Sequence, residues 1–220
     1  MIRNSDNQDW LIAFFLVLAV AYVCVKMIFG KYWRKYRRAM LYSQEAQKLI
    51  YEKNVLLLQA AVSLNVLAAF SIGLFVYLFL THFDLIAQLP ENFYGWALTT
   101  LTVIVIAGAK YFIIGILGKS GNNTEASIQI NHQWLINHKN FGFFLLPFSA
   151  ASAFLLHPID ELALYIGMAL LVIMLIMNYV KGFMFLLQHR ISIYYGILYL
   201  CTLEILPILI IWKVICFLRE

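Results

Sequence analysis

The sequence predicts an all-α protein, a polytopic bundle of about six transmembrane helices. Of its 220 residues, 63% are hydrophobic and only 12% are charged, whereas an ordinary soluble domain is about 45–50% apolar and about 25% charged. The apolar residues are also grouped into long blocks, and these approach the roughly 20 residues that a helix needs to cross a bilayer. We therefore treat residues 1–220 as a single membrane domain.

Hydropathy divides the chain into six predicted spans. The leading segment carries Arg3 against Asp6 and Asp9, so it lacks the net positive charge of a signal peptide, and we read the first span as a retained transmembrane helix. The fourth span is short and contains Pro147, which leaves a re-entrant segment as the alternative there. The six spans are expected at about 10–29, 55–80, 94–117, 141–156, 162–180 and 191–217.

The positions of Lys and Arg set the expected orientation, because cytoplasmic loops hold the excess of both residues. The segment after the first span is rich in them, whereas the loops 82–93 and 157–161 contain none. Lys119 and Lys139 fall in the predicted loop between the third and fourth spans. Lys181 and Arg190 flank the turn between the fifth and sixth spans. This alternation predicts an N-out, C-out protein, with both termini outside the cytoplasm.

Residues 31–54 form the predicted cytoplasmic segment between the first two spans. The segment is amphipathic and basic, contains neither Gly nor Pro, and is rich in helix formers, so we expect a helical hairpin extension or an interfacial helix. Its basic residues interleave with aromatic ones. Beside a membrane this pattern favours anchoring on anionic lipid over partner docking, and both over binding of nucleic acid. The residues expected to anchor the segment are Lys31, Trp33, Arg34, Lys35, Arg37 and Arg38.

The histidines are expected near the ends of spans. His82 and His157 should lie at the outer boundary, and His132, His138 and His189 at the cytoplasmic one. Nothing in the sequence shows that their rings face one another, so histidines that meet water are favoured over haem or metal ligands. No HExxH motif, Ser–His–Asp order or close intramembrane carboxylate pair is present. We therefore predict no catalytic residue, no metal and no cofactor.

Lys110 and Glu204 lie well inside predicted spans, where an ionisable side chain facing lipid would cost roughly 2.5–3.5 kcal/mol. Both are therefore expected to face the interior of the bundle. At 1.5 Å per residue, Lys110 lies about 13 Å from the cytoplasmic end and Glu204 about 21 Å from it, counting from Lys119 and Arg190. Because helical side chains tilt toward their own N-terminus, the two would lean toward each other. The sequence does not show whether their helices are neighbours.

The last span has a second polar feature beside Glu204. Pro207 is expected to kink the helix and to leave the carbonyl of Leu203 unpaired. A polar stripe runs along the opposite side at helical spacing, which favours a central position for this helix. The stripe consists of Ser192, Tyr195, Tyr199 and Thr202.

Two functional interpretations follow from these intramembrane groups. In the favoured one, Glu204 and Lys110 form a clamp that fixes helix register or docks another membrane protein. The chain would then be a non-enzymatic subunit, or an assembly or scaffold factor, that acts through partner membrane proteins or as a homo-oligomer. In the alternative, Glu204 and Lys110 form an ion or proton site in a small transporter or conducting protein. A membrane enzyme is the third class, and no catalytic constellation supports it.

The nonamer YLCTLEILP, residues 199–207, resembles the C-terminal signature of a bacterial membrane-protein family, the domain-of-unknown-function family numbered 4271. The preceding HRISIYY, residues 189–195, is similar to the basic-then-aromatic entry of the same helix. The resemblance covers about residues 94–220. It implies a multi-pass protein of the inner membrane of a Gram-negative bacterium, with its termini in the periplasm. It implies no activity, cofactor or catalytic residue.

Overall fold

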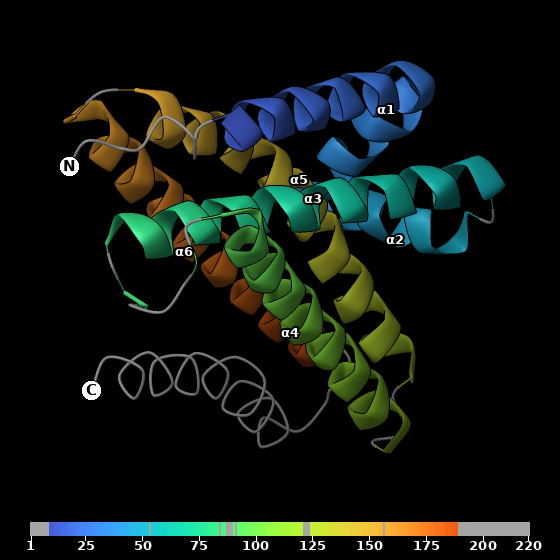
Figure 1. Ribbon diagram of the computed structural model, residues 1–220. Coiled ribbons are helices and arrows are strands. Elements are labelled where there is room, and N and C mark those ends of the chain that lie inside the picture. Colours follow the sequence, from blue (N-terminus) through green and yellow to red (C-terminus); the bar gives the residue numbers. More distant parts are fainter. Residues whose placement is uncertain are drawn as a thin grey trace.

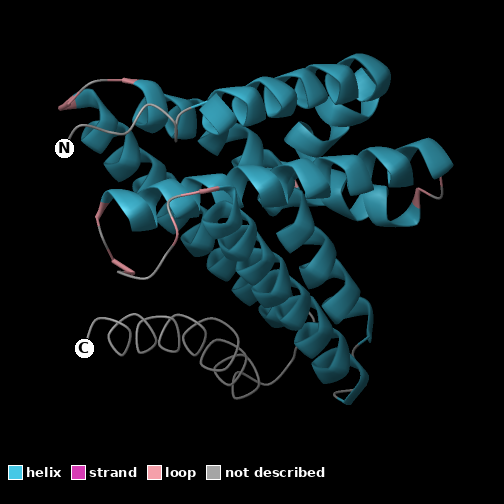
Figure 2. Ribbon diagram, viewed as in Figure 1, coloured by secondary structure: helices cyan, strands magenta, loops and turns pink. Residues whose placement is uncertain are grey.

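The computed structural model describes residues 9–188, apart from residues 53, 84, 87–89, 91, 121–123 and 156. Helices account for most of this part of the chain (Figure 1), and it contains no strand (Figure 2). The prediction of an all-α protein is therefore confirmed. The helices are α1 (Asp9–Leu41), α2 (Ser43–Tyr51), α3 (Val55–His82), α4 (Phe93–Ser120), α5 (Thr124–Phe154) and α6 (Ile159–Gln188).

Four of these helices are long and apolar enough to cross a membrane. The candidate spans are Trp10–Met40 in α1, Val55–His82 in α3, Phe93–Ile116 in α4 and Ile159–Gly182 in α6. They correspond to the first, second, third and fifth predicted spans. Much of their apolar surface is exposed, as at Leu16, Val105 and Ile176, and apolar surface on this scale is typical of helices that face lipid or a partner.

The predicted sixth span, 191–217, lies outside the described residues. The candidate residues on or beside it lie there too, namely Arg190, Tyr195, Tyr199, Thr202, Glu204 and Pro207. The count of six spans and the N-out, C-out orientation therefore stay predictions.

The predicted fourth span, 141–156, is the C-terminal part of a longer helix. α5 begins at Thr124 and continues through Pro147 to Phe154. Among the described residues α5 is not one of the candidate spans, because its first half is rich in Asn, Gln and His. The expected loop before residue 141 is therefore wrong over 124–140. Lys139, which we counted as a loop cation, is 4% exposed inside α5 and gives no support to the orientation.

The basic segment 31–54 is helical, as expected, but its first half continues α1. A single residue with non-helical backbone angles, Phe29 (φ −114°, ψ 25°), kinks α1 just before the segment begins. After Leu41 the chain turns into the short α2. The basic part of the segment is thus one arm of a bent helix whose other arm is apolar.

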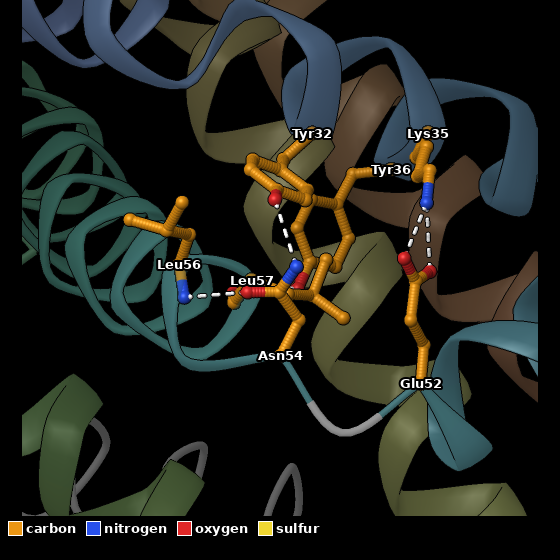
Figure 3. A network of polar contacts seen from close by, with 7 residues as sticks. All are labelled: Tyr32, Lys35, Tyr36, Glu52, Asn54, Leu56 and Leu57. Atoms are coloured by element: carbon orange, nitrogen blue, oxygen red, sulfur yellow. Dashed lines mark hydrogen bonds and ion pairs between the residues drawn. The ribbon is translucent and has the colours of Figure 1, made fainter.

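A polar network joins the second arm of α1, the end of α2 and the start of α3 (Figure 3). The Lys35 ammonium on α1 donates to both carboxylate oxygens of Glu52, at 2.6 and 2.7 Å. The Asn54 side chain caps α3 by accepting from the backbone N–H of Leu56 at 3.0 Å, and its Nδ2 donates to the Tyr32 hydroxyl at 3.0 Å. The cap satisfies one of the backbone donors left free at a helix start.

α3 and α5 occupy the centre of the bundle (Figure 1), and α5 packs against every other described helix. Two glycines permit close crossings of α3. A side chain at Gly142 of α5 would place its Cβ 2.5 Å from the Ala68 Cα, and one at Gly73 would place it 2.8 Å from the Thr100 Cα of α4. Small residues at crossings let membrane helices approach closely. These contacts hold α3 close to both α5 and α4.

Candidate functional site

The polar half of α5 lies in the interior of the protein. Burying a polar group without a hydrogen bond typically costs about 1–3 kcal/mol by mutational measures, so a run of such groups in one helix calls for a structural or functional reason. Because α5 touches all the other described helices, the run faces several neighbours at once. Its buried members are Ser127, Gln129, Asn131, Gln133, Asn137, His138, Lys139 and Asn140.

Three amides form a chain between α5 and α6. Gln133 Nε2 donates to Asn137 Oδ1 at 3.3 Å, and Asn137 Nδ2 donates to Asn178 Oδ1 at 2.5 Å. Asn137, in the middle, is fully buried. At the two ends, Gln133 Oε1 and Asn178 Nδ2 have no hydrogen-bond partner among the described residues. This amide chain (Gln133, Asn137, Asn178) therefore offers one free acceptor and one free donor in the interior.

Lys139 lies on the side of α5 that faces α1. Its ammonium sits 4.4 Å from the centroid of the Tyr36 ring. Asn140 Nδ2 donates to the Tyr36 carbonyl at 3.3 Å, and the Tyr36 hydroxyl donates to the Leu57 carbonyl at 3.4 Å. In the part of the chain that the structure describes, no carboxylate forms an ion pair with Lys139. Burial lowers the pKa of Lys139 to about 8, so most of the population still carries the charge at pH 7.

Two histidines of the same helix are neutral neighbours of this lysine. Burial, and then the charge of Lys139, lowers the pKa of both His132 and His138 to about 4. His132 Nδ1 has no hydrogen-bond partner among the described residues. His138 is 8% exposed and its ring lies 5.4 Å from that of Trp134. The expectation that His138 meets water at a membrane boundary is wrong, because that part of α5 is packed inside the bundle.

Lys110 on α4 faces α5. Its ammonium lies 5.7 Å from the centroid of the Trp134 ring, and one residue further along α4 the Tyr111 carbonyl accepts from Asn131 Nδ2 at 3.4 Å. A cation over an aromatic face is attracted by about 0.5–1 kcal/mol at exposed sites and more when desolvated. Lys110 thus points toward α5, and its expected partner Glu204 lies outside the described residues.

A second cluster of ionisable groups joins the end of α3 to the start of α6. His82 Nε2 lies 3.9 Å from a carboxylate oxygen of Glu161, and His157 Nδ1 lies 3.4 Å from the same oxygen and 3.6 Å from Asp160. The sequence placed both histidines at one boundary, and they share one carboxylate. No group of three or more His, Cys, Asp or Glu side chains among the described residues is placed to hold a metal ion.

The residues expected to anchor the protein on lipid divide into two sets. Trp33 is 8% exposed and packs edge to face on Phe143 at 5.0 Å, so its ring lies inside the protein. Lys35 is held by Glu52. The other four are exposed on one side of the second arm of α1, and none forms an ion pair with a described residue. We call these four the basic ridge: Lys31, Arg34, Arg37 and Arg38.

The sequence analysis missed the amide chain and the buried Lys139. One signal was present, since Asn178 is the only Asn or Gln in the apolar block 162–180. A lone amide in a membrane span usually faces another helix, where it finds a hydrogen-bond partner. The partner could not be named, because residues 124–140 read as a polar loop.

An all-helical membrane protein with a polar interior is the class that this fold and site define. The family described as a domain of unknown function (DUF4271) matches residues 11–215, and the chain belongs to this family. The match begins in α1, so it takes in the first three helices as well as the C-terminal region in which the signature lies. No match is found among the curated proteins or the solved structures.

Proposed function

We propose that this protein is a non-enzymatic, multi-pass subunit or assembly factor of the inner membrane of a Gram-negative bacterium. It acts by binding another membrane protein or a second copy of itself. The observation that best supports the proposal is the basic ridge. Its four exposed cations form no ion pair with a described carboxylate, and the ridge continues directly from an apolar span.

The ridge is suited to the cytoplasmic face of such a membrane. Each Lys or Arg near an anionic lipid surface contributes roughly 1 kcal/mol, so four of them contribute about 4 kcal/mol. The kink at Phe29 separates the ridge from the apolar arm of α1 and lets it lie along the headgroups. When the ridge is anchored in this way, α1 presents its exposed apolar side chains, such as Leu16 and Val20, to a partner within the bilayer.

Cross-linking in native membranes, followed by purification in mild detergent and mass spectrometry, tests this proposal. The wild-type protein should carry one partner, or a second copy of itself, in fixed stoichiometry. An Arg34→Gln, Arg37→Gln double variant should lose at least half of that partner. A Lys26→Gln, Lys48→Gln variant removes the same amount of charge from exposed lysines outside the ridge, and it should retain the partner. A wild-type protein that remains monomeric and alone would rule the proposal out.

Transport or proton conduction is the second candidate function, and the polar interior around α5 supports it. Ionisable groups inside membrane bundles often line ion or proton pathways, and Lys110 points toward the buried polar run. In this proposal Lys110 works together with Glu204. A Lys110→Met variant in liposomes should lower proton or ion flux at least tenfold, while Lys26→Met should leave it unchanged. Wild-type flux no higher than that of empty vesicles would reject this candidate.

A further inference from the structure

Lys139 is a buried cation that forms no ion pair with a carboxylate of the described residues. Taking an ammonium out of water carries a large desolvation penalty. The Tyr36 ring, 4.4 Å away, attracts the ammonium and offsets part of that penalty. Asn140, whose Nδ2 donates to the carbonyls of Ile136 and Tyr36, is a neutral amide and supplies no negative charge. An additional group of negative charge would close the difference.

A second cation contacts the same stretch of α1. The Lys181 ammonium, from α6, donates to the Met40 carbonyl. Met40 is one turn beyond Tyr36, about 6 Å along the helix axis at 1.5 Å per residue. The nearby carboxylate of Glu52 is bound through both oxygens by Lys35. Lys139 from α5 and Lys181 from α6 therefore contact residues of α1 that are one turn apart. The carboxylate of Glu52 is already paired with Lys35.

We propose that Lys139 and Lys181 together bind an oxyanion, a phosphate or carboxylate group, beside the Tyr36–Met40 turns of α1. An oxyanion has several acceptor oxygens, and each ammonium has three donors. Lys181 thus keeps donors beyond the one that it gives to Met40. The site does not depend on the basic ridge, whose side chains point outward, and it goes beyond the proposed partner function.

His132 fits the same site. It lies seven residues before Lys139, which places the two on one face of α5 about two turns apart. The Lys139 side chain tilts toward the N-terminus of its helix and so toward His132. The unpaired Nδ1 of His132 is then available to donate to a bound oxyanion, in the tautomer that carries the proton there.

Thermal unfolding in a phosphate-free maltoside detergent tests the proposal, with inorganic phosphate and phosphatidylglycerol as the two probes. Sodium chloride at equal ionic strength controls for screening. At least one probe should raise the Tm of the wild-type protein beyond chloride. Stabilisation by phosphate identifies a soluble oxyanion, and stabilisation by the lipid alone identifies a headgroup. If neither probe raises the Tm more than chloride does, the proposal fails.

Variants locate the site. Lys139→Met and Lys181→Met should each weaken the affinity for the effective probe at least tenfold, and Lys48→Met, which changes an exposed lysine of α2, should leave it unchanged. If Lys139→Met does not fold, two other variants replace it in the test. Lys181→Met should weaken binding, and Lys139→Arg, which keeps the charge, should retain it. The assignment would be overturned if Lys139→Met and Lys181→Met both kept the wild-type affinity. If Lys139→Met is unfolded, unchanged affinity in Lys181→Met alone would overturn it.

Discussion

A Gly142→Leu variant should lose much of its thermal stability in mild detergent. The first atom of any side chain at this position, the Cβ, would lie 2.5 Å from the Ala68 Cα, 2.6 Å from the Ala68 Cβ and 3.1 Å from the Ala68 carbonyl oxygen. Two of these atoms belong to the α3 backbone, so no rotamer change can move them away. The α3 and α5 helices must separate instead, and both core clusters that include α3 and α5 residues are then disturbed.

The size of this effect can be bounded. Overpacking a core typically costs about 1–3 kcal/mol of stability when neighbouring side chains adjust. A clash with backbone atoms, which cannot adjust, should cost about 3 kcal/mol or more. For a chain of this size, 1 kcal/mol corresponds to a Tm change of about 2–4 °C. Gly142→Leu should therefore lower the Tm by about 6–12 °C, measured by tryptophan fluorescence during heating.

Gly108→Leu on α4 is the matched control. Nothing lies within 4 Å of the Cβ that it would add, and the position is exposed. The same leucine there should change the Tm by less than about 2 °C, since surface substitutions are usually within about 0.5 kcal/mol of neutral. Equal losses of stability in the two variants would mean that the α3–α5 crossing is not as close as the structure places it.

The spans were predictable and the interior was not, for one physical reason. A span is signalled by the length of an apolar block, which hydropathy reads directly in α1, α3, α4 and α6. Hydropathy cannot distinguish a polar loop from a polar helix that is buried among other helices. Residues 124–140 are polar in either case, and only the packing of α5 between its neighbours decides that they lie inside.

The basic segment shows the same limit at one residue. Aromatic and basic residues interleaved beside a span indicate the headgroup level, and by this rule Trp33 was expected on the lipid. The rule ignores which side of the helix faces the protein. Trp33 and the buried Tyr36 are three residues apart and share a face, and that face turns into the core against Phe143 and Leu57. The exposed basic ridge occupies the other side.

His82 and His157 illustrate what topology alone can supply. Their common boundary followed from the alternation of spans, and both come within 4 Å of Glu161. That they share one carboxylate depends on how α3 and α6 are placed around the bundle, which the order of spans does not determine. The close crossings at Gly73 and Gly142 were beyond prediction for the same reason.

Asn137→Leu should destabilise the protein more than the triple change Gln133→Leu, Asn137→Leu, Asn178→Leu. Asn137 is the middle of the amide chain, so its removal leaves Gln133 Nε2 without an acceptor and Asn178 Oδ1 without a donor. Each orphaned buried group costs about 1–3 kcal/mol in soluble proteins. Interhelical hydrogen bonds in membranes average about 0.6 kcal/mol with a maximum near 1.7, so a loss of about 2 kcal/mol is the reasonable expectation for the single variant.

The triple variant removes all three amides together and leaves none of them orphaned. Replacement of both partners of a buried hydrogen bond by apolar groups of similar shape is often close to neutral, so its free energy of unfolding should lie within about 1 kcal/mol of the wild type. Gln59→Leu, at an exposed position of α3, controls for the added leucine. A stepwise loss of stability from single to triple variant would contradict the prediction, because it would mean that the amides stabilise the fold individually.

The comparison also separates structure from function in this interior. If the triple variant is stable and still binds its partner, the amide chain contributes little beyond filling space between α5 and α6. If the triple variant is stable but has lost its partner or its flux, Gln133 Oε1 and Asn178 Nδ2, which have no hydrogen-bond partner among the described residues, are retained for a ligand or a pathway. Buried polar groups that do not stabilise a fold need another reason to be there, and this variant identifies which reason applies.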